Sequence, residues 1–138
     1  MGGIFNIIYP VFSSPAYTTM KVDELAQTTH QYQRDWAGML DFYEEEIRIF
    51  ERLLDEVAHE HPDRLSILEH VEEYEAILQR KKQHIMELRS KINTLTHPSP
   101  ANEPAATDWV DLDHLIRHFS TDIEALKKNF RRFTAHND

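Results

Sequence analysis

The chain contains no cysteine and very little glycine. The absence of cysteine excludes a disulfide framework, a thiolate metal site and a cysteine nucleophile, and it agrees with a reducing, cytoplasmic location. Glycine occurs three times in 138 residues, twice at positions 2 and 3, and four of the six prolines lie at or after Pro62. Because both residue types destabilise helix interiors, their scarcity favours long helices.

Positive charge is also scarce, since 15 basic residues stand against 24 acidic ones and the formal net charge is −9. Such a chain is repelled by a phosphate backbone, so nucleic acid is not an expected partner. The apolar stretch 1–17 lacks a basic leader and is too short to cross a membrane. Its Asn6 stands where a myristoylation motif has Ser or Thr. We therefore expect no stable membrane insertion. Met20, which opens a segment compatible with a helix, is an alternative start of the native chain.

Apolar residues are abundant at alternating spacings of four and three, a heptad-type pattern that indicates helices packed at shallow angles. The first run comprises Trp36, Leu40, Tyr43, Ile47, Phe50, Leu54 and Val57. A second run extends from Ile67 to Leu95, and a third from Leu112 to Phe133. Three amphipathic helices can bury these runs against one another in a single core.

The breaks between the runs set the helix boundaries. The first helix is expected at 28–61, because Thr28 and Gln31 form a capping-box pattern and Pro62 disfavours a helical conformation in the residue before it. The second helix, 63–96, begins directly after that proline. A turn this short makes the two helices antiparallel.

The segment 97–108 contains three prolines and forms a connector. Asp108 or Asp111 then caps a third helix at 109–134, and residues 1–27 form an irregular or flexible arm. The prediction is an all-α protein, an antiparallel up-down-up three-helix bundle with long coiled-coil-like helices.

Residues 42–50 read FYEEEIRIF, and three consecutive carboxylates raise the question of acid-base or metal chemistry. In a helix that buries Tyr43 and Ile47, Glu45 points to solvent. Glu44 and Glu46 flank opposite edges of the apolar run. The helix therefore separates the three glutamates, and only the flanking pair can contact another helix.

Lys81 is the one non-apolar member of the three runs, and a buried ammonium group needs a partner. The short connection between the first two helices places Tyr43 level with Lys81, and Glu46 lies about one helical turn from Tyr43. Glu46 is therefore the expected partner of Lys81, and the Tyr43 hydroxyl is expected to assist. Acidic residues at 41–46 and basic residues at 127–132 fall at the same level. This structural charge pair is expected to fix helix register rather than to perform chemistry.

Nine histidines make metal binding the alternative function. Glu56 and His59 have the Glu-x-x-His spacing of di-iron helical proteins, and His114, His118 and Asp122 could form a ladder on one helix face. The alternative is thus a hemerythrin- or ferritin-like di-metal protein. The leading expectation is a protein without a cofactor. In the Glu56/His59 pattern the histidine faces outward, and the three predicted helices lack the fourth helix that completes a di-metal ligand set.

Other catalytic patterns are missing, including a Gly-rich phosphate loop and a Ser/His/Asp set, so the protein is expected not to be an enzyme. Apolar residues outside the three runs indicate a surface for another helical protein or for a second copy of the chain. They are Met39, Phe42, Ile49, Leu53, Ile77 and Met86.

The text W-x3-L-x2-Y-x3-I-x6-L-x2-V, from Trp36 to Val57, is accompanied by Arg52-Leu53 and by VEEY at 71–74. It resembles a family of small uncharacterised bacterial helical-bundle proteins, over roughly residues 30–95. The resemblance implies a helical bundle and no particular activity. The family has histidine where this chain has Glu73, so a family histidine role does not transfer.

Overall fold

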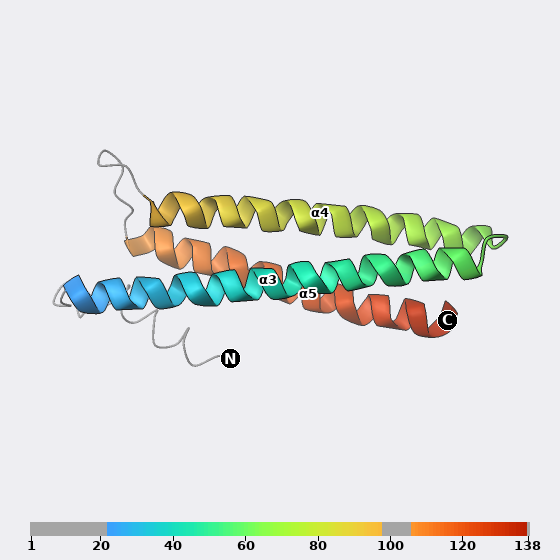
Figure 1. Ribbon diagram of the computed structural model, residues 1–138, viewed down its shortest axis with the longest axis horizontal. Coiled ribbons are helices and arrows are strands. Elements are labelled where there is room, and N and C mark those ends of the chain that lie inside the picture. Colours follow the sequence, from blue (N-terminus) through green and yellow to red (C-terminus); the bar gives the residue numbers. More distant parts are fainter. Residues whose placement is uncertain (1–21, 98–105, 138) are drawn as a thin grey trace.

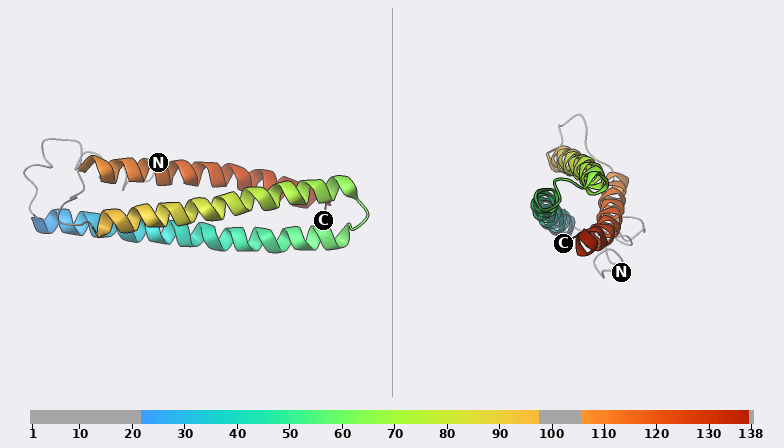
Figure 2. Two further views of the ribbon diagram at one scale, coloured as in Figure 1. Left: turned by 90° about the horizontal axis from the view of Figure 1, so that it is seen from above. Right: turned by 90° about the vertical axis from the view of Figure 1, so that its right-hand side faces the viewer.

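The computed structural model describes residues 22–97 and 106–137, and within them the chain forms three helices and no strand. These are α3 (Val22–Glu60), α4 (Leu65–Thr96) and α5 (Ala106–Asn137). Figure 1 shows the helices side by side along most of their length, and the end-on view in Figure 2 shows them grouped around a common axis. The prediction of an all-α, up-down-up three-helix bundle is confirmed.

The helix ends differ from the expected ones. α3 begins at Val22 rather than at residue 28, so the capping-box position lies inside the helix, and the predicted irregular arm is wrong for residues 22–27. The sequence before position 28 contains Glu, Leu, Ala and Gln, which are strong helix formers and extend the helix past the local cap signal. The remainder of the predicted arm, residues 1–21, lies outside the described residues.

α4 begins at Leu65, two residues later than expected. Pro62 lies in the turn instead, where the Arg64 amide donates to the His61 carbonyl oxygen over 3.2 Å. Arg64 is extended (φ −105°, ψ 91°) and contributes no side-chain cap. α5 begins at Ala106, which places Asp108 in its first turn, where a carboxylate is favoured by the helix dipole.

The predicted apolar runs form the core that joins the three helices. Every member of the first run is buried, and Leu40, Ile47 and Leu54 have no exposed surface. In the other runs, Tyr74, Ile92 and Phe133 are only partly buried and pack against this core. Four other buried side chains lie outside the predicted runs, namely Tyr32, Trp109, Asp113 and Lys127.

Aromatic rings gather at both ends of the core. Tyr32, Trp36 and Trp109 form a three-ring cluster, in which the Trp36 centroid lies 4.8 Å from Tyr32 and 5.8 Å from Trp109, and this cluster joins α3 to α5. Near the turn, Phe130 of α5 lies 4.6 Å from Phe50 of α3 and 5.4 Å from Tyr74 of α4. None of the described helices is apolar and long enough to cross a membrane.

Candidate functional site

Polar side chains join α3 to α5 through the interior of the bundle. Trp36 Nε1 donates a hydrogen bond of 3.1 Å to Asp113 Oδ1, and the Asp113 side chain is fully buried. The Tyr43 hydroxyl lies 2.7 Å from Ser120 Oγ. Both contacts join residues 77 apart in sequence, as expected for two helices that run in parallel with a constant register.

The Tyr43 hydroxyl also donates to Glu124 Oε2 over 3.0 Å, so Ser120 is left to donate to the tyrosine oxygen. Burial raises the pKa of Tyr43, and the neighbouring Glu124 carboxylate raises it further. The phenol therefore stays protonated and acts as a hydrogen-bond donor between the two helices.

The most buried ion pair lies on the same interface. Lys127 Nζ of α5 is 2.5 Å from Glu46 Oε1 of α3, with side chains 7% and 18% exposed, and it is 3.5 Å from Glu124 Oε2. The ammonium group also lies 5.2 Å from the centroid of the Phe42 ring. Burial disfavours the charge on Lys127, but the hydrogen bond and charge of Glu46 outweigh it, so the pKa of Lys127 is raised.

The predicted partnership of Glu46 with Lys81 is therefore wrong. Lys81 is half-buried and its Nζ lies 5.9 Å over the Phe119 ring, and within the described part of the chain it makes no ion pair. The Tyr43 hydroxyl likewise contacts Ser120 and Glu124 of α5 and not Lys81. Helix phase gives α3 two edges, but which edge faces α4 and which faces α5 depends on the handedness of the bundle. Periodicity does not encode that handedness.

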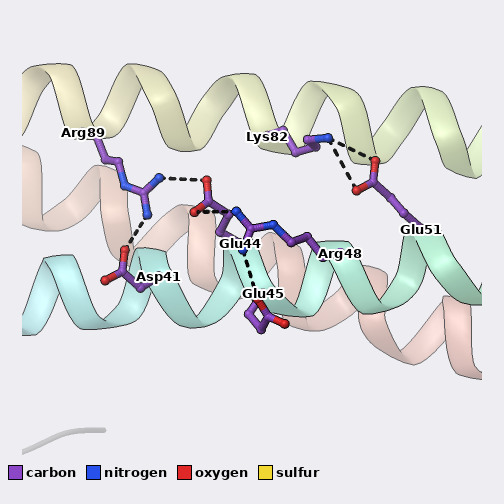
Figure 3. A network of polar contacts seen from close by, with 7 residues as sticks. All are labelled: Asp41, Glu44, Glu45, Arg48, Glu51, Lys82 and Arg89. Carbon is purple, nitrogen blue, oxygen red and sulfur yellow. Dashed lines mark hydrogen bonds and ion pairs between the residues drawn. The ribbon is translucent and has the colours of Figure 1, made fainter.

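The other edge of α3 binds α4 (Figure 3). Arg89 of α4 donates from Nη1 to Glu44 Oε2 over 2.9 Å and from Nη2 to Asp41 Oδ1 over 2.5 Å. The hydrogen bond from Arg89 lowers the pKa of Glu44 and raises that of the guanidinium. A single arginine thus holds two carboxylates of the neighbouring helix.

Two further contacts extend this network along the same pair of helices. Lys82 Nζ lies 3.2 Å from Glu51 Oε2, and Arg48 Nη1 donates to Glu45 Oε2 over 3.0 Å within α3. Figure 3 shows Arg48 between Glu44 and Glu45, and it lies 3.6 Å from the former. These side chains are more exposed than Lys127, so their individual contributions to stability are small, typically below about 1 kcal/mol.

The predicted register, with Tyr43 level with Lys81, is kept in the core, where the Tyr43 ring and Lys81 Nζ both lie 5.9 Å from the centre of the Phe119 ring. The charged contacts at the edge of the two helices are offset from it. Glu44 instead meets Arg89, roughly two turns further along α4. In an antiparallel pair, each side chain leans back toward the N-terminus of its own helix. Two side chains therefore touch when each of the two Cα atoms lies beyond the point of contact, in the C-terminal direction of its own helix.

The five metal-candidate residues do not form one site. His118 Nε2 lies 3.4 Å from Asp122 Oδ2, but their side chains are 76% and 45% exposed, and His114 is exposed as well. Glu56 and His59 are exposed near the end of α3. Across residues 22–97 and 106–137, no three or more His, Asp or Glu side chains converge on a metal position.

An open groove of about 370 Å³ separates the turn-proximal parts of α3 and α4. It is lined by Glu51, Asp55, Glu72, Glu75, Ala76 and Gln79. Lys82 and Gln79 both donate to Glu51, and the positive charge of Lys82 offsets part of the negative charge of the groove. The groove resembles the solvated flank of a helix pair more than a binding cleft.

The predicted partner surface divides into two groups. Met39, Leu53 and Ile77 are partly buried and pack against the core. Phe42, Ile49 and Met86 are exposed by 53%, 39% and 67%. Phe42 and Ile49 are seven residues apart and thus share one face of α3, whereas Met86 stands on α4 among polar neighbours.

Gly38 lies one turn before Phe42 on this face, and a Cβ atom added to it would meet no atom within 4 Å. We call the surface made by Gly38, Phe42 and Ile49 the α3 outer face. The two large residues of this face were predicted from the sequence, whereas Gly38 was not, although its position in the helix interior was an available signal.

Comparison with protein-family models, with curated proteins and with solved structures found no match to the chain. The resemblance to small bacterial helical-bundle proteins therefore stays a prediction from sequence.

Proposed function

We propose that this protein is a non-enzymatic structural module that binds a partner helix through the α3 outer face. The observation that carries the proposal is the exposure of Phe42 and Ile49, by 53% and 39%, at heptad spacing on one helix. A helix packed on this face would remove both side chains from water, which is favourable by about 25 cal/mol per Å² of apolar surface.

The glycine on this face supports the same proposal. A glycine in a helix interior costs about 0.5–1 kcal/mol relative to alanine. No contact within the monomer accounts for this cost at Gly38, because a side chain there would enter open space. A glycine does allow another helix to approach closely, within the 8–10 Å typical of packed helices.

The remaining exposed apolar side chains offer less. Leu65, Met86 and Leu115 are 71%, 67% and 44% exposed, but Leu65 begins α4, far along that helix from Met86, and Leu115 stands alone on the described part of α5. Single exposed apolar residues are ordinary on soluble proteins and need no partner to explain them.

The buried polar groups support a structural rather than a catalytic role. The contacts Trp36–Asp113, Tyr43–Ser120 and Glu46–Lys127 each join α3 to α5. Each pairs a group of one helix with a complementary group of another, and such pairs can specify register. We accordingly propose a cytoplasmic module that acts without a cofactor.

The proposal is tested by affinity capture from the native host with wild-type protein, Ile49→Glu and Met86→Glu. Ile49→Glu places a charge on the α3 outer face and should lose the partner, whereas Met86→Glu, a matched change on α4, should retain it. Circular dichroism checks that both variants are folded.

Gly38→Gln provides a second variant that removes no contact of the monomer. Its side chain enters open space and blocks a closely packed helix, so it should also lose the partner. Retention of the same captured proteins by both α3 variants would refute the proposal.

A further inference from the structure

We infer that the partner helix is α3 of a second copy of this chain, bound in antiparallel orientation; this inference rests on the proposed function. Along one edge of the α3 outer face the charge alternates in sign every seven residues. Arg34, Asp41, Arg48 and Asp55 are all exposed, the middle two by 72% and 59%. Heptad spacing keeps these four side chains on the same edge.

This alternation is self-complementary when the second helix runs in the opposite direction. In an antiparallel pair, the same edge of both helices meets. Asp41 then faces Arg48 of the second copy, and Arg34 faces its Asp55, and symmetry repeats both pairs. All four contacts join opposite charges.

The same register also pairs the residues along the centre of the face, where Phe42 lies opposite Glu45 of the second copy. It places Ile49 of one copy over Gly38 of the other, where the glycine leaves open space. It also brings Asp35 opposite Arg52 of the second copy. An apolar side chain thus fills the space above the glycine, and a further pair of opposite charges lies beside it.

A parallel pair lacks this match. In a parallel pair, one edge of each helix packs against the opposite edge of the other helix. A residue then faces the residue five positions later in the second copy. Asp41 would then face Glu46 of the second copy, and Arg34 would face Met39. Glycine would also lie over glycine and leave a void, which forfeits packing energy.

Asp41 and Arg48 already have partners within the monomer, Arg89 for the first and Glu44 with Glu45 for the second. Their exposure leaves each side chain able to accept or donate a second contact from another helix. The interchain pairs would therefore extend the network of Figure 3 across the dimer.

Cysteine cross-linking tests the orientation, because the natural chain has no cysteine. In the antiparallel register the two-fold axis passes close to residues 43–44. Glu45→Cys then lies within one turn of its equivalent and should form a disulfide-linked dimer under mild oxidation. The two copies of Arg52→Cys lie roughly 25 Å apart at about 1.5 Å per residue and cannot be bridged.

The expected result is a covalent dimer with Glu45→Cys and a monomer with Arg52→Cys on a non-reducing gel. Cross-linking of both variants would indicate a parallel pair, and cross-linking of neither, or of Arg52→Cys alone, would exclude this dimer. Each of these three outcomes overturns the inference.

Charge reversal tests the pairing itself. Arg34→Asp and Asp55→Arg each set like charges opposite one another, so each should weaken the dimer by about tenfold in Kd, measured by sedimentation equilibrium. The double variant restores opposite charges and should return Kd to near the wild-type value. Additive weakening in the double variant would contradict the inference.

Failure of the inference is distinguishable from failure of the proposed function. A chain that stays monomeric at high micromolar concentration overturns the antiparallel dimer. The proposed function still stands if capture recovers a different protein that Ile49→Glu releases and Met86→Glu retains.

Discussion

Two lysines of similar sequence surroundings have different roles in this bundle. Lys127 is 7% exposed in its side chain and held by Glu46, whereas Lys81 is half-buried and lies over an aromatic ring. A buried ammonium group is tolerated only with a charged partner, because the cost of desolvation is otherwise uncompensated. The charge of Glu46 is thus more important to the fold than that of its two neighbours in the glutamate run.

Removal of Glu46 should be more harmful than removal of its partner. Glu46→Ala leaves Lys127 buried with only Glu124 nearby, at 3.5 Å, and should lower the free energy of unfolding by about 2–4 kcal/mol. Lys127→Met leaves the more exposed Glu46 free to contact water and should cost less. Urea denaturation measures both changes.

Lys81→Met is the matched control for this comparison. It removes the same charge from a half-buried lysine that has no ion pair within the described residues, so the expected change is under about 1 kcal/mol. Equal effects of Lys81→Met and Glu46→Ala would show that the buried pair has no special importance.

The indole hydrogen bond of Trp36 should also contribute measurably. Trp36→Phe keeps an aromatic ring in the core but removes the Nε1–H group that donates to the buried Asp113. We expect a loss of about 1–3 kcal/mol, because a polar group in the interior loses a donor. Trp109→Phe is the control. It alters the same aromatic cluster, so an equal loss in both variants would assign the effect to packing.

At the scale of the helices, the heptad pattern predicted most of what the structure contains. The apolar positions from Trp36 to Val57 form one buried stripe, and the turn between α3 and α4 lies close to its predicted place and contains Pro62. The start of α3 was missed because helix propensity before residue 28 outweighed a local cap pattern. Cap signals of about 1 kcal/mol do not decide a boundary against several favourable residues.

Gly38→Ala tests the helix propensity of α3. The added methyl group would meet no atom within 4 Å, so only the conformational effect remains. At low micromolar concentration we expect the free energy of unfolding to rise by about 0.5–1 kcal/mol. Ala37→Gly, at the neighbouring exposed position, should lower it by a similar amount. Destabilisation by Gly38→Ala would point to a required contact at the glycine.

The contact between α3 and α4 should depend on pH through Glu44. Its pKa lies below the ordinary value of 4.5 because Arg89 donates a hydrogen bond to the carboxylate. A lowered pKa in the folded state contributes stability above the ordinary pKa, and that stability is lost as the pH falls through the lowered value. Glu44→Gln should therefore be less stable than wild type at neutral pH, by about 1 kcal/mol, and the difference should disappear in acid.

Urea midpoints of both proteins between about pH 7 and about pH 3 measure this difference. Glu45→Gln is the control, since Glu45 is 58% exposed and contacts Arg48 of its own helix. A difference between Glu44→Gln and wild type that persists unchanged in acid would mean that the carboxylate charge is not its source.

For the whole molecule, the sequence predicted the number and direction of the helices but not their handedness or the offset of their side chains. The sequence correctly predicted that Glu46 lies at the level of residues 127–132. Because of that limit, Lys81 rather than Lys127 was predicted as its ion-pair partner. The same limit explains why Asp113 was missed, because its burial depends on a single long-range contact with Trp36. Periodicity describes each helix alone, whereas these contacts depend on how two helices are placed together.

The continuity of the core predicts that the bundle unfolds in a single step. Both tryptophans, Trp36 and Trp109, lie in one cluster that joins α3 to α5, so intrinsic fluorescence reports on that end of the molecule. Circular dichroism reports on all three helices. Because buried residues connect the cluster to the aromatic group at Phe130, the two signals should change at the same urea concentration.

A reporter at the other end completes the test. In Trp36→Phe/Trp109→Phe/Tyr74→Trp, the single tryptophan lies among Phe130 and Phe133, and its fluorescence midpoint should again coincide with circular dichroism of the same protein. A fluorescence transition that precedes the loss of helix in wild type, but not in this variant, would show that the Trp36 end opens independently. In that case the buried contacts between α3 and α5 would stabilise their own end of the bundle without coupling it to the turn.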